Sequence, residues 1–393
     1  MPVLGMRGTG SFSSDERPKN YREQILLLQP NAKQKASLTS LLAMMKMEPT
    51  NDPEFKIFTK GLPSQRVLVS GSHTSGVTSI ALQGTTPAKV LKKGHALINE
   101  RTLEVLWVTA DPSGAFAAIT VARGKGSTAA SMNDGDGLMV VGNHNQEGAD
   151  VPTAISYDPS VTTNYIQTHR TSLDITNDAR ATKLRTGPAL LELQRETLEI
   201  HGIERENTYV FGTGVEDTSG AQPERTTKGH IAMVTTNVKD FADAVDIDSW
   251  EQFLEDCFED GSNEKMLLAG NAAITVINKV ARLHGEINML PTSETYGMDL
   301  SRYRTPYGYL IIGQEALFSK NPTFKDWGIV LDPAYMVDRI LQGNGVDGDT
   351  DYFPNRQANG ADKTTDEWIT RSGFELQHET VFGVAKNMSA FIP

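Results

Sequence analysis

The longest regular pattern of apolar residues in this chain lies within 188–211 and predicts one long α-helix. Apolar and short polar side chains recur there at alternating spacings of three and four residues, which is the spacing of one helix face. The stripe consists of Leu190, Leu193, Thr197, Ile200, Ile203, Asn207 and Val210. We therefore predict that its apolar members are buried and organise the fold, namely Leu190, Leu193, Ile200, Ile203 and Val210.

Both ends of the predicted helix carry a sequence signal. Gly187 and Pro188 suit an N-cap and a first helical residue, and Gly212 suits a stop. At about 1.5 Å per residue the helix runs for roughly 36 Å, about the width of a small domain. It is either an ordinary amphipathic core helix or a helix that runs the length of the fold. The sequence of this stretch alone leaves both interpretations open. Aspartate at Ile200 and Ile203 is expected to collapse the fold, because each change buries an unpaired charge.

Short alternating runs predict strands between residues 55 and 141. Their apolar members are Val67, Val69, Ile80, Leu82, Leu97, Val105, Trp107, Ile119 and Val121. Turn-forming segments separate the runs, among them Asp-Pro-Ser-Gly at 111–114, which suits a type I turn. We predict a β-meander or small barrel, followed by a polar connecting arm at 142–183.

After the long helix, the pattern predicts a second lobe of α/β character. One apolar run at helical spacing stops at Gly261, and Asn271 caps a further helix. The predicted helices lie at 250–258, 271–281 and 336–341, and the predicted strands at 231–234, 266–269, 307–312, 327–331, 374–377 and 381–385. The last two strands follow a long acidic loop and are expected to form a closing pair.

The first 50 residues predict an arm. Residues 1–24 are rich in glycine, serine and charge without periodicity, so they cannot bury themselves. Leu38, Leu41, Leu42 and Met45 then have the spacing of a short amphipathic helix. The arm is either a solvated tail or a segment that a neighbouring subunit orders, and both remain open.

Composition places the chain among globular proteins of two or three lobes. It has 393 residues, 38% of them apolar, with 34 glycines and 18 prolines, which favours many strands and loops. It lacks a long apolar run and an N-terminal signal sequence, so neither export nor a membrane span is expected. The single cysteine, Cys257, excludes an intrachain disulfide and a thiolate cluster, and its helical spacing predicts a buried apolar residue.

Charge and missing motifs argue against nucleic-acid binding and catalysis. A formal net charge of −12 disfavours a continuous basic surface for phosphates. The eight histidines are scattered, and Arg-Gly-Lys-Gly-Ser-Thr at 123–128 lacks the spacing of a phosphate loop. The aspartates within 347–351 do not fit an EF-hand, because Tyr352 and Ala358 take its glycine and glutamate positions. We predict no catalytic, cofactor-binding or metal site, and a structural protein rather than an enzyme.

Several short motifs, in this order, resemble one group of phage capsid proteins. The strand-rich region ends at 123–128, where that group has an RGxGGT-like turn and this chain has Ser127 for the second glycine of the pair. A Glu-Gly step at 147–148 and Asn-Tyr-Ile-Gln at 164–167 follow, and the chain closes with FELQHETVFGVAKNMS. From about residue 25, the chain is similar to the major capsid proteins of tailed bacteriophages, which have the Hong Kong 97-type fold. Pro188 and the acidic loop depart from the group.

The resemblance implies an α+β capsid fold in several parts. These are an N-terminal arm at 1–50, a β-rich extended-loop region at 51–175, a peripheral domain at 176–245 plus 365–393, and an axial domain at 246–364. The helix at 188–211 would be the spine of the peripheral domain. The axial domain would meet its copies at the centre of each hexamer or pentamer.

The resemblance also implies a function. The protein would be a major head protein that self-assembles into hexamers and pentamers of an icosahedral virion shell, built in the host bacterial cytoplasm. The shell would enclose double-stranded phage DNA without sequence-specific binding. Implied partners are copies of itself, a portal, a decoration protein and a separate scaffolding protein, the last because the chain starts almost directly with the arm. No cofactor or membrane is implied.

Two other classes of function stay open from the residues alone. A β-rich phage tail or baseplate binding protein would form small fixed oligomers, usually trimers. An enzyme of unknown type would place its site between the two lobes. Oligomeric state distinguishes the first from a capsid protein, whose contacts close into rings.

Overall fold

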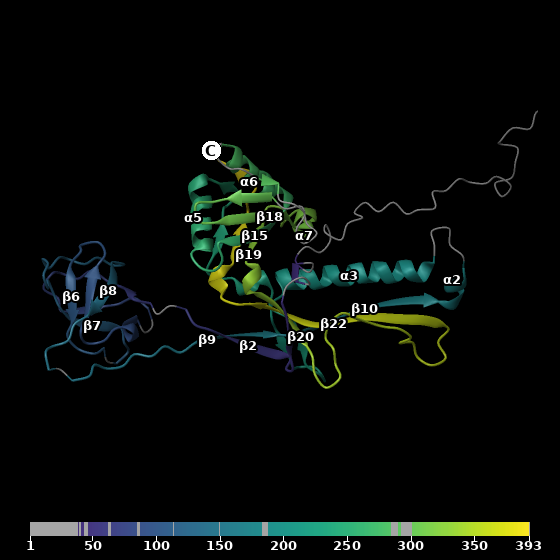
Figure 1. Cartoon of the computed structure of the whole chain (residues 1–393), viewed down its shortest axis with the longest axis horizontal. Coiled ribbons are helices and arrows are strands. Elements are labelled where there is room, and N and C mark those ends of the chain that lie inside the picture. The colour runs from purple at the N-terminus through teal and green to yellow at the C-terminus, as the bar shows by residue number, and fades with distance from the viewer. Residues whose placement is uncertain are drawn as a thin grey trace, which may run out of the picture. The chain divides into compact units, whose positions relative to one another are not determined.

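The computed structural model describes residues 38, 41–42, 46–61, 64–84, 87–112, 114–148, 150–182, 188–283, 290–291 and 301–392. They form two compact units (Figure 1). We call Phe58–Val161 the insert unit and the described residues outside it the main unit. Helices and strands are mixed in the main unit, which confirms the predicted α+β class.

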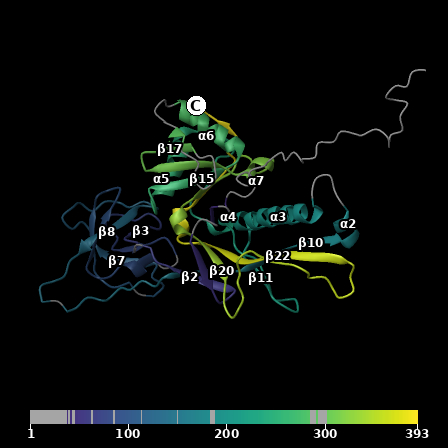
Figure 2. The same cartoon turned by 45° about the vertical axis from the view of Figure 1, so that its right-hand side comes forward.

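A long sheet runs through part of the main unit. Its strands are ordered β1, β20, β22 and β10, and β21 also pairs with β22. Their bounds are β1 (Met47–Thr50), β20 (Met336–Leu341), β22 (Lys363–Leu376), β10 (Gln167–Thr176) and β21 (Asp351–Phe353). Every residue of β10 pairs with β22 in antiparallel register. The helix α3 (Ala189–Phe211) lies along these two strands in both views (Figures 1 and 2).

The second sheet of the main unit, which we call the mixed sheet, has seven strands. In order they are β13 (Val238–Asp240), β23 (Gly383–Lys386), β19 (Gly328–Leu331), β15 (Glu264–Ala269), β18 (Tyr309–Gln314), β17 (Ser301–Arg304) and β16 (Leu290–Pro291). β15 pairs in parallel with β18 and antiparallel with β19. Because β15 is covered on both faces, its last four residues are all apolar and buried.

Two cores meet at β15. Leu267 and Ala269 pack with apolar residues of α5 (Ile247–Phe258) and α6 (Asn271–Leu283). Met266 and Leu268 belong to the other core, which also contains residues of β22, the end of α3 and the leucines at 38, 41 and 42. This second core therefore joins the long sheet, the mixed sheet and α3 into one unit.

The insert unit has a six-stranded antiparallel sheet and its own core. The strand order is β3 (Arg66–Leu68), β8 (Gly137–Asn143), β5 (His95–Asn99), β6 (Val105–Val108), β7 (Ala118–Ala122) and β4 (Ser79–Ala81). Most of the predicted alternating residues are buried, but on β6 the structure buries Leu106 and Val108 in place of Val105 and Trp107. Since side chains alternate across a strand, assigning the wrong parity reverses every face on it.

Shorter elements complete the fold. They are β2 (Glu54–Thr59), η3 (Pro87–Val90), β9 (Ser160–Tyr165), α2 (Asn177–Ala181), β11 (Glu216–Asp217), β12 (Glu224–Arg225), α4 (His230–Met233), β14 (Ala244–Val245), α7 (Ala316–Lys320), η4 (Pro333–Tyr335), η5 (Glu379–Val381) and β24 (Ala390–Phe391). β2 pairs with β9 where the chain enters and leaves the insert unit. Between α3 and α4, Gly229 N donates to Gly212 O at 2.9 Å. A Cβ on Gly229 would lie 2.8 Å from Thr208 O, so only glycine fits there.

The long helix is confirmed as α3, but its buried face differs from the predicted stripe. Val210 is fully buried, whereas Leu190, Leu193 and Ile203 are only partly buried and Ile200 is 50% exposed. The buried positions include His201, Arg205 and Tyr209 instead. The prediction was wrong here because the face that meets the long sheet is polar, so hydrophobic spacing did not identify it.

This difference reverses one mutational expectation. We now expect Ile200→Asp to leave the thermal midpoint of the isolated subunit almost unchanged, because surface substitutions usually cost within about 0.5 kcal/mol. Val210→Asp, on the same helix, is expected to destabilise the subunit severely because it buries an unpaired carboxylate. Calorimetry of the two variants tests the pair, and equal midpoints would contradict the observed burial.

Three further element predictions were wrong. Residues 336–341 form the strand β20 rather than a helix, and 230–233 form the helix α4 rather than a strand. The two closing strands exist as β22 and β23, but they belong to different sheets. Short apolar runs of four to six residues fit either a helix or a strand, and the pairing partners decide between them.

Strand pairing does not follow the expected domain boundaries. β10, expected in the β-rich region, belongs to the long sheet, as do β20 and β21, which were expected in the axial domain. β23, expected in the peripheral domain, lies in the mixed sheet. Of the expected arm, the leucines at 38, 41 and 42 are helical and buried, while Met45 and residues 1–37 lie outside the described residues. Among the helices described, none is long and apolar enough to span a bilayer.

Candidate functional site

Three of the buried polar clusters among the described residues join several elements, and the first lies between α3 and the long sheet. We call it the polar layer. It consists of Thr171, Gln194, His201, Arg205, Tyr209, Asp338, Tyr352, Asp366, Thr370 and Ser372. Its helix members, Gln194, His201, Arg205 and Tyr209, follow one another at spacings of seven, four and four residues, so they share one face of α3. The layer fixes the helix on the sheet through directional bonds, where apolar packing alone would permit several registers.

Histidine 201 lies at the middle of the polar layer. Its Nδ1 lies 2.9 Å from Thr171 Oγ1 on β10, and its Nε2 lies 2.7 Å from Thr370 Oγ1 on β22. Farther towards the helix N-terminus, Gln194 donates to the Tyr352 hydroxyl, which in turn donates to Asp366. α3 is thereby bonded to three strands of the long sheet.

A buried ion pair anchors the C-terminal half of α3. The Arg205 guanidinium pairs with Asp338 on β20, and the Tyr209 hydroxyl donates to Asp338 Oδ1 at 2.9 Å. The same hydroxyl lies 2.6 Å from Ser372 Oγ on β22. Burial raises the pKa of Asp338, and the Arg205 charge opposes that shift. A buried pair of this kind adds little net stability, but loss of either partner leaves an uncompensated charge.

Buried imidazoles make the main unit sensitive to acid. Burial, and to a smaller extent the charge of Arg205, lowers the pKa of His169 and the pKa of His201 to about 4. Burial alone lowers the pKa of His230 to about 3. The unfolded chain binds these protons from about pH 6.5, so stability is complete above that pH and falls as the pH drops towards 4.

We expect the free energy of unfolding to fall by up to about 4 kcal/mol per pH unit from these three histidines between pH 6 and 4.5. Denaturant unfolding at a series of pH values measures the slope. His201→Gln is expected to reduce the slope by up to about 1.4 kcal/mol per pH unit. An unchanged slope would show that His201 gains no proton on unfolding.

The second place is the Asn-Tyr-Ile-Gln motif at 164–167, whose first and last side chains bond to backbone groups of other segments where β9 leads into β10. Asn164 Nδ2 donates to Phe374 O at 2.7 Å, and Asn164 Oδ1 accepts from Lys228 N at 2.7 Å. Gln167 Oε1 accepts from Thr227 N at 3.1 Å. Asn164 is almost fully buried, so each of these bonds satisfies a backbone group that would otherwise lack a partner. The motif ties β9, β22 and the segment before α4 together.

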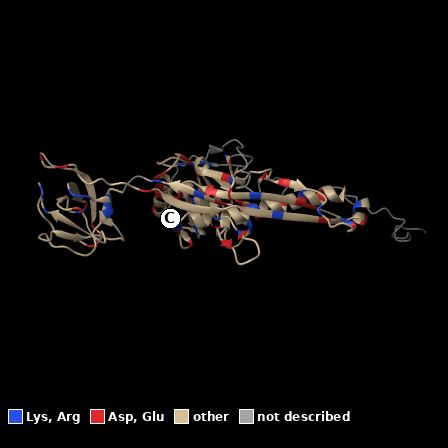
Figure 3. Ribbon diagram, turned by 90° about the horizontal axis from the view of Figure 1, so that it is seen from below, with Lys and Arg blue, Asp and Glu red and all other residues tan. Residues whose placement is uncertain are grey.

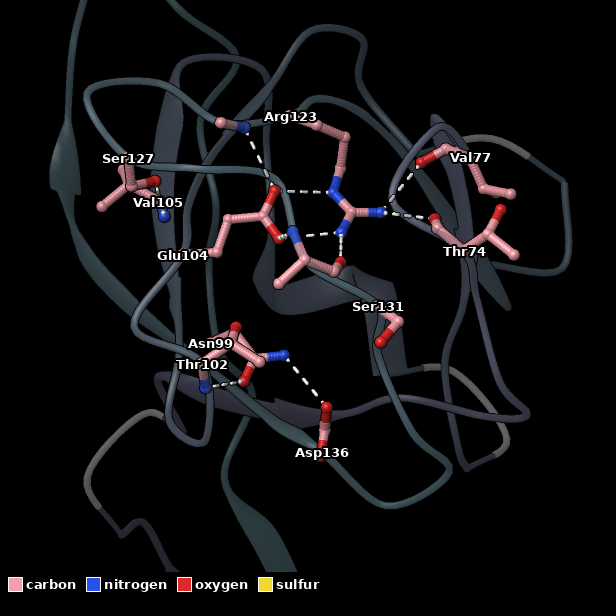
Figure 4. Close-up of polar contacts among 12 residues, drawn as sticks. Thr74, Val77, Asn99, Thr102, Glu104, Val105, Arg123, Ser127, Ser131 and Asp136 are labelled. Atoms are coloured by element: carbon pink, nitrogen blue, oxygen red, sulfur yellow. Dashed lines mark hydrogen bonds and ion pairs between the residues drawn. The ribbon is translucent and has the colours of Figure 1, made fainter.

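The third place is the Glu104–Arg123 cluster inside the insert unit (Figure 4). Arg123 donates from Nε and Nη2 to the two carboxylate oxygens of Glu104, each at 2.8 Å. Its Nη1 also donates to the carbonyls of Thr74 and Val77, at 3.1 and 3.2 Å. The guanidinium therefore joins the loop before β4 to the start of β6.

The carboxylate of Glu104 is equally well bonded. It accepts from Gly124 N at 3.1 Å and from Ala130 N at 3.0 Å. Burial disfavours the carboxylate, but Arg123 and these amides outweigh it and hold the pKa of Glu104 below its usual range. The glycine-rich turn thus cradles a carboxylate of this chain rather than a phosphate. Ser127, which departs from the family pattern, accepts from Val105 N at 2.8 Å.

Metal binding, the single cysteine and a basic surface were also considered from the sequence. Within the described residues, no group of three or more histidine, cysteine, aspartate or glutamate side chains is placed to hold a metal ion. Cys257 is buried, and burial raises the pKa of its thiol to about 12. Basic and acidic positions are mixed along the ribbon in Figure 3 rather than gathered by sign.

Sequence reasoning missed the members of the polar layer and the Glu104–Arg123 pair. One signal was present in α3, where His201, Arg205 and Tyr209 recur every four residues. For Glu104 and Asp338 there was no local signal, because their partners lie 19 and 133 residues away. Ile200, a member of the predicted stripe, is exposed. Leu191 and Leu198, which do not belong to the stripe, are exposed as well.

The known proteins to which this chain is similar include a phage major capsid protein, an encapsulin and a particle capsid. It is 25% identical over 360 residues to the major capsid protein of Pseudomonas phage PaMx41, which covers 85% of this chain and 84% of that one. A solved SrpI encapsulin complex from Synechococcus elongatus is similar at 9% identity and a TM-score of 0.49, over 99% of each chain. The capsid of an empty GTA particle is similar at 7% identity and a TM-score of 0.48, over 96% of this chain and 97% of that one.

The family assignment rests on nearly the whole chain. Residues 7–389 match the model of the SU10 major capsid protein family. This span includes both units, the polar layer and the Glu104–Arg123 cluster. The chain therefore belongs to the SU10 major capsid protein family and is a shell-forming major capsid protein of a phage virion.

Proposed function

We propose that copies of this chain form the hexamers and pentamers of an icosahedral shell that encloses double-stranded phage DNA. The observation that carries the proposal is the family match over residues 7–389. The acidic balance of the chain agrees with a wall that confines DNA by enclosure, because a strongly basic surface would bind phosphates. Assembly is proposed to take place in the host cytoplasm.

Exposed apolar side chains support contacts between copies. On α3, Leu191 is 62% exposed, Leu198 40% and Ile200 50%. Single exposed apolar residues are ordinary, and these three do not share one helix face, because Ile200 follows Leu191 by nine residues, which is about two and a half turns. Ile200 lies opposite the polar layer, so it is the one that suits a contact with another copy. In this proposal α3 is the spine helix, and Leu190, Leu193, Ile203 and Val210 hold it against its own subunit while Ile200 faces another.

The parts of the subunit are proposed to have separate roles. Of the expected arm 1–50, residues 1–37 act on a neighbouring copy, whereas the leucines at 38, 41 and 42 and the strand β1 pack in their own subunit. The β-rich region overlaps a neighbour, and the lobe with the mixed sheet meets its copies around the capsomer axis. A scaffolding protein, a portal and a decoration protein are the proposed partners. The family consists of structural capsid proteins, and we propose that this chain has no catalytic role.

The decisive experiment is negative-stain microscopy combined with sedimentation. The protein is expressed alone and together with the neighbouring phage genes. Closed shells, polymorphic spheres, or rings of five and six subunits support the proposal. A strict monomer or trimer under every condition overturns it and favours the tail or baseplate alternative.

Removal of residues 1–30 tests the arm separately. We expect the shortened chain to remain folded and soluble, because residues 1–24 lack the composition to build a core of their own. We also expect that it fails to close shells. Sedimentation and circular dichroism measure both properties, and particles of normal size from the shortened chain would remove the arm from the proposal.

A further inference from the structure

The insert unit contains a cavity that has no role assigned to it so far. Its volume is about 720 Å³, within the range of about 300–1,000 Å³ that is typical of small-molecule sites. One wall is formed by the end of β6 and the residues after it, from Trp107 to Asp111. The opposite wall is formed by residues of 144–146 and 150–153, which follow β8 and have no regular secondary structure.

The two walls are tied together at both ends of the cavity. At one end, His144 N donates to Gly94 O at 2.8 Å. At the other, Thr153 Oγ1 donates to Asp111 Oδ2 at 2.8 Å, and Lys93 N donates to Asp111 Oδ1 at 2.7 Å. These bonds lower the pKa of Asp111 and keep it ionised. The cavity is therefore formed before any ligand arrives.

An aromatic side chain forms a rigid part of the wall. The ring of Trp107 lies 4.0 Å from that of His144, centroid to centroid, with 33° between their planes. Lys125 Nζ lies 5.2 Å from the centroid of the Trp107 ring. Trp107 nevertheless remains 37% exposed. A ring held by two neighbours loses little conformational entropy when a ligand contacts it.

The polar groups of the cavity favour a neutral ligand with many hydroxyls. The lining contains both the amine of Lys93 and the carboxylates of Asp111 and Asp150, so a ligand of either charge would meet a like charge. Gln146 offers both a donor and an acceptor. His144 Nδ1 is buried without a hydrogen-bond partner among the described residues and is closed to a ligand, so His144 holds the Trp107 ring, while Gln146 and the carboxylates supply the accessible donors and acceptors. Hydroxyl groups satisfy both kinds of partner.

We propose that this cavity binds a neutral saccharide. Sugar hydroxyls would bond with Gln146 and with the carboxylate of Asp150, while the C–H surface of the ring would pack on the exposed part of Trp107 and on Val151, which is 94% exposed. The competing occupant is an extended segment of a second copy. β6 disfavours that occupant, because it already pairs with β5 and β7 and offers no free edge for strand addition.

The test uses the full-length chain and a panel of glucose, galactose, mannose and N-acetylglucosamine. Saturation-transfer NMR detects binding, and titration gives the affinity. We expect at least one sugar to bind with a Kd on the order of 1 mM, as suits a ligand of about twelve non-hydrogen atoms. Gln146→Ala and His144→Ala are each expected to weaken that binding at least tenfold.

Met139→Ala is the matched control. Met139 is an exposed residue of β8 outside the cavity lining, so the substitution is expected to leave sugar binding unchanged. Gln146 lines the cavity with an exposed side chain, so its variant should keep the native circular dichroism even if His144→Ala does not. Absence of saturable binding by every sugar overturns the proposal, as does binding that both cavity variants retain. Protection of Trp107 from acrylamide in shells, without sugar binding, would assign the cavity to a second copy instead.

Discussion

Replacing Arg205 by methionine is expected to destabilise the main unit by about 3–5 kcal/mol, because it leaves Asp338 ionised and unpaired in the interior. Asp338 is completely buried, and its other polar contact with α3 is the hydroxyl of Tyr209. The carboxylate must then stay charged without a counter-ion or take up a proton, and either change costs stability. Unfolding in denaturant, followed by far-UV circular dichroism, measures the loss.

Two controls separate burial from charge. Arg195→Met removes an exposed arginine of the same helix, which pairs with Glu199 at i,i+4, and should cost less than about 1 kcal/mol. Arg205→Met combined with Asp338→Leu removes both buried charges and is expected to recover most of the stability, since apolar replacements of buried pairs are often neutral. If the single variant at Arg205 costs no more than that at Arg195, the polar layer does not hold α3 on the sheet.

Replacing Arg123 by methionine is expected to unfold the insert unit while the main unit stays folded. Glu104 has a fully buried side chain, and loss of Arg123 should cost about 3–5 kcal/mol within a unit of only about a hundred residues. The core of the insert unit contains none of the residues of the main cores. Amide hydrogen exchange should therefore lose protection in β5 to β8 and keep it in β15 and β22.

The insert unit supplies a matched control for this variant. Arg66 also makes a two-pronged bond to a glutamate, Glu100, at 2.6 and 2.7 Å. That pair is solvated, with side chains 54% and 37% exposed, whereas those of Arg123 and Glu104 are 5% and 0% exposed. Arg66→Met should therefore cost much less stability than Arg123→Met. Similar losses in the two variants would show that burial of the Glu104–Arg123 pair has no special weight.

Much of the fold was predictable for elements whose own apolar residues show which side is buried. α5 and α6 have a clear apolar stripe that faces the mixed sheet, and β15 is a short apolar run because both of its faces are covered. The ends of α3 were also signalled, by Pro188 and Gly212. In each case the period of hydrophobic residues reports directly on burial.

The candidate sites could be predicted only in part. The glycine-rich turn and the Asn-Tyr-Ile-Gln segment stood out in the sequence, but their chemistry did not. The turn meets Glu104 from the loop just before β6, and Asn164 meets Phe374 from the far end of the chain. A polar side chain has no marker in the sequence that tells whether water or a distant backbone group will satisfy it.

By itself, the sequence determined the class of the protein, the position of its long helix, most strands of the insert unit and the resemblance to phage capsid proteins. These properties depend on local periodicity and on short motifs in a fixed order. Only the tertiary structure decided which face of α3 is buried, which sheet receives 336–341 and 383–386, and which charges are paired in the interior. The physical reason is that hydrophobic period records burial by apolar contact, whereas burial by hydrogen bonds and ion pairs depends on partners that are distant in the chain.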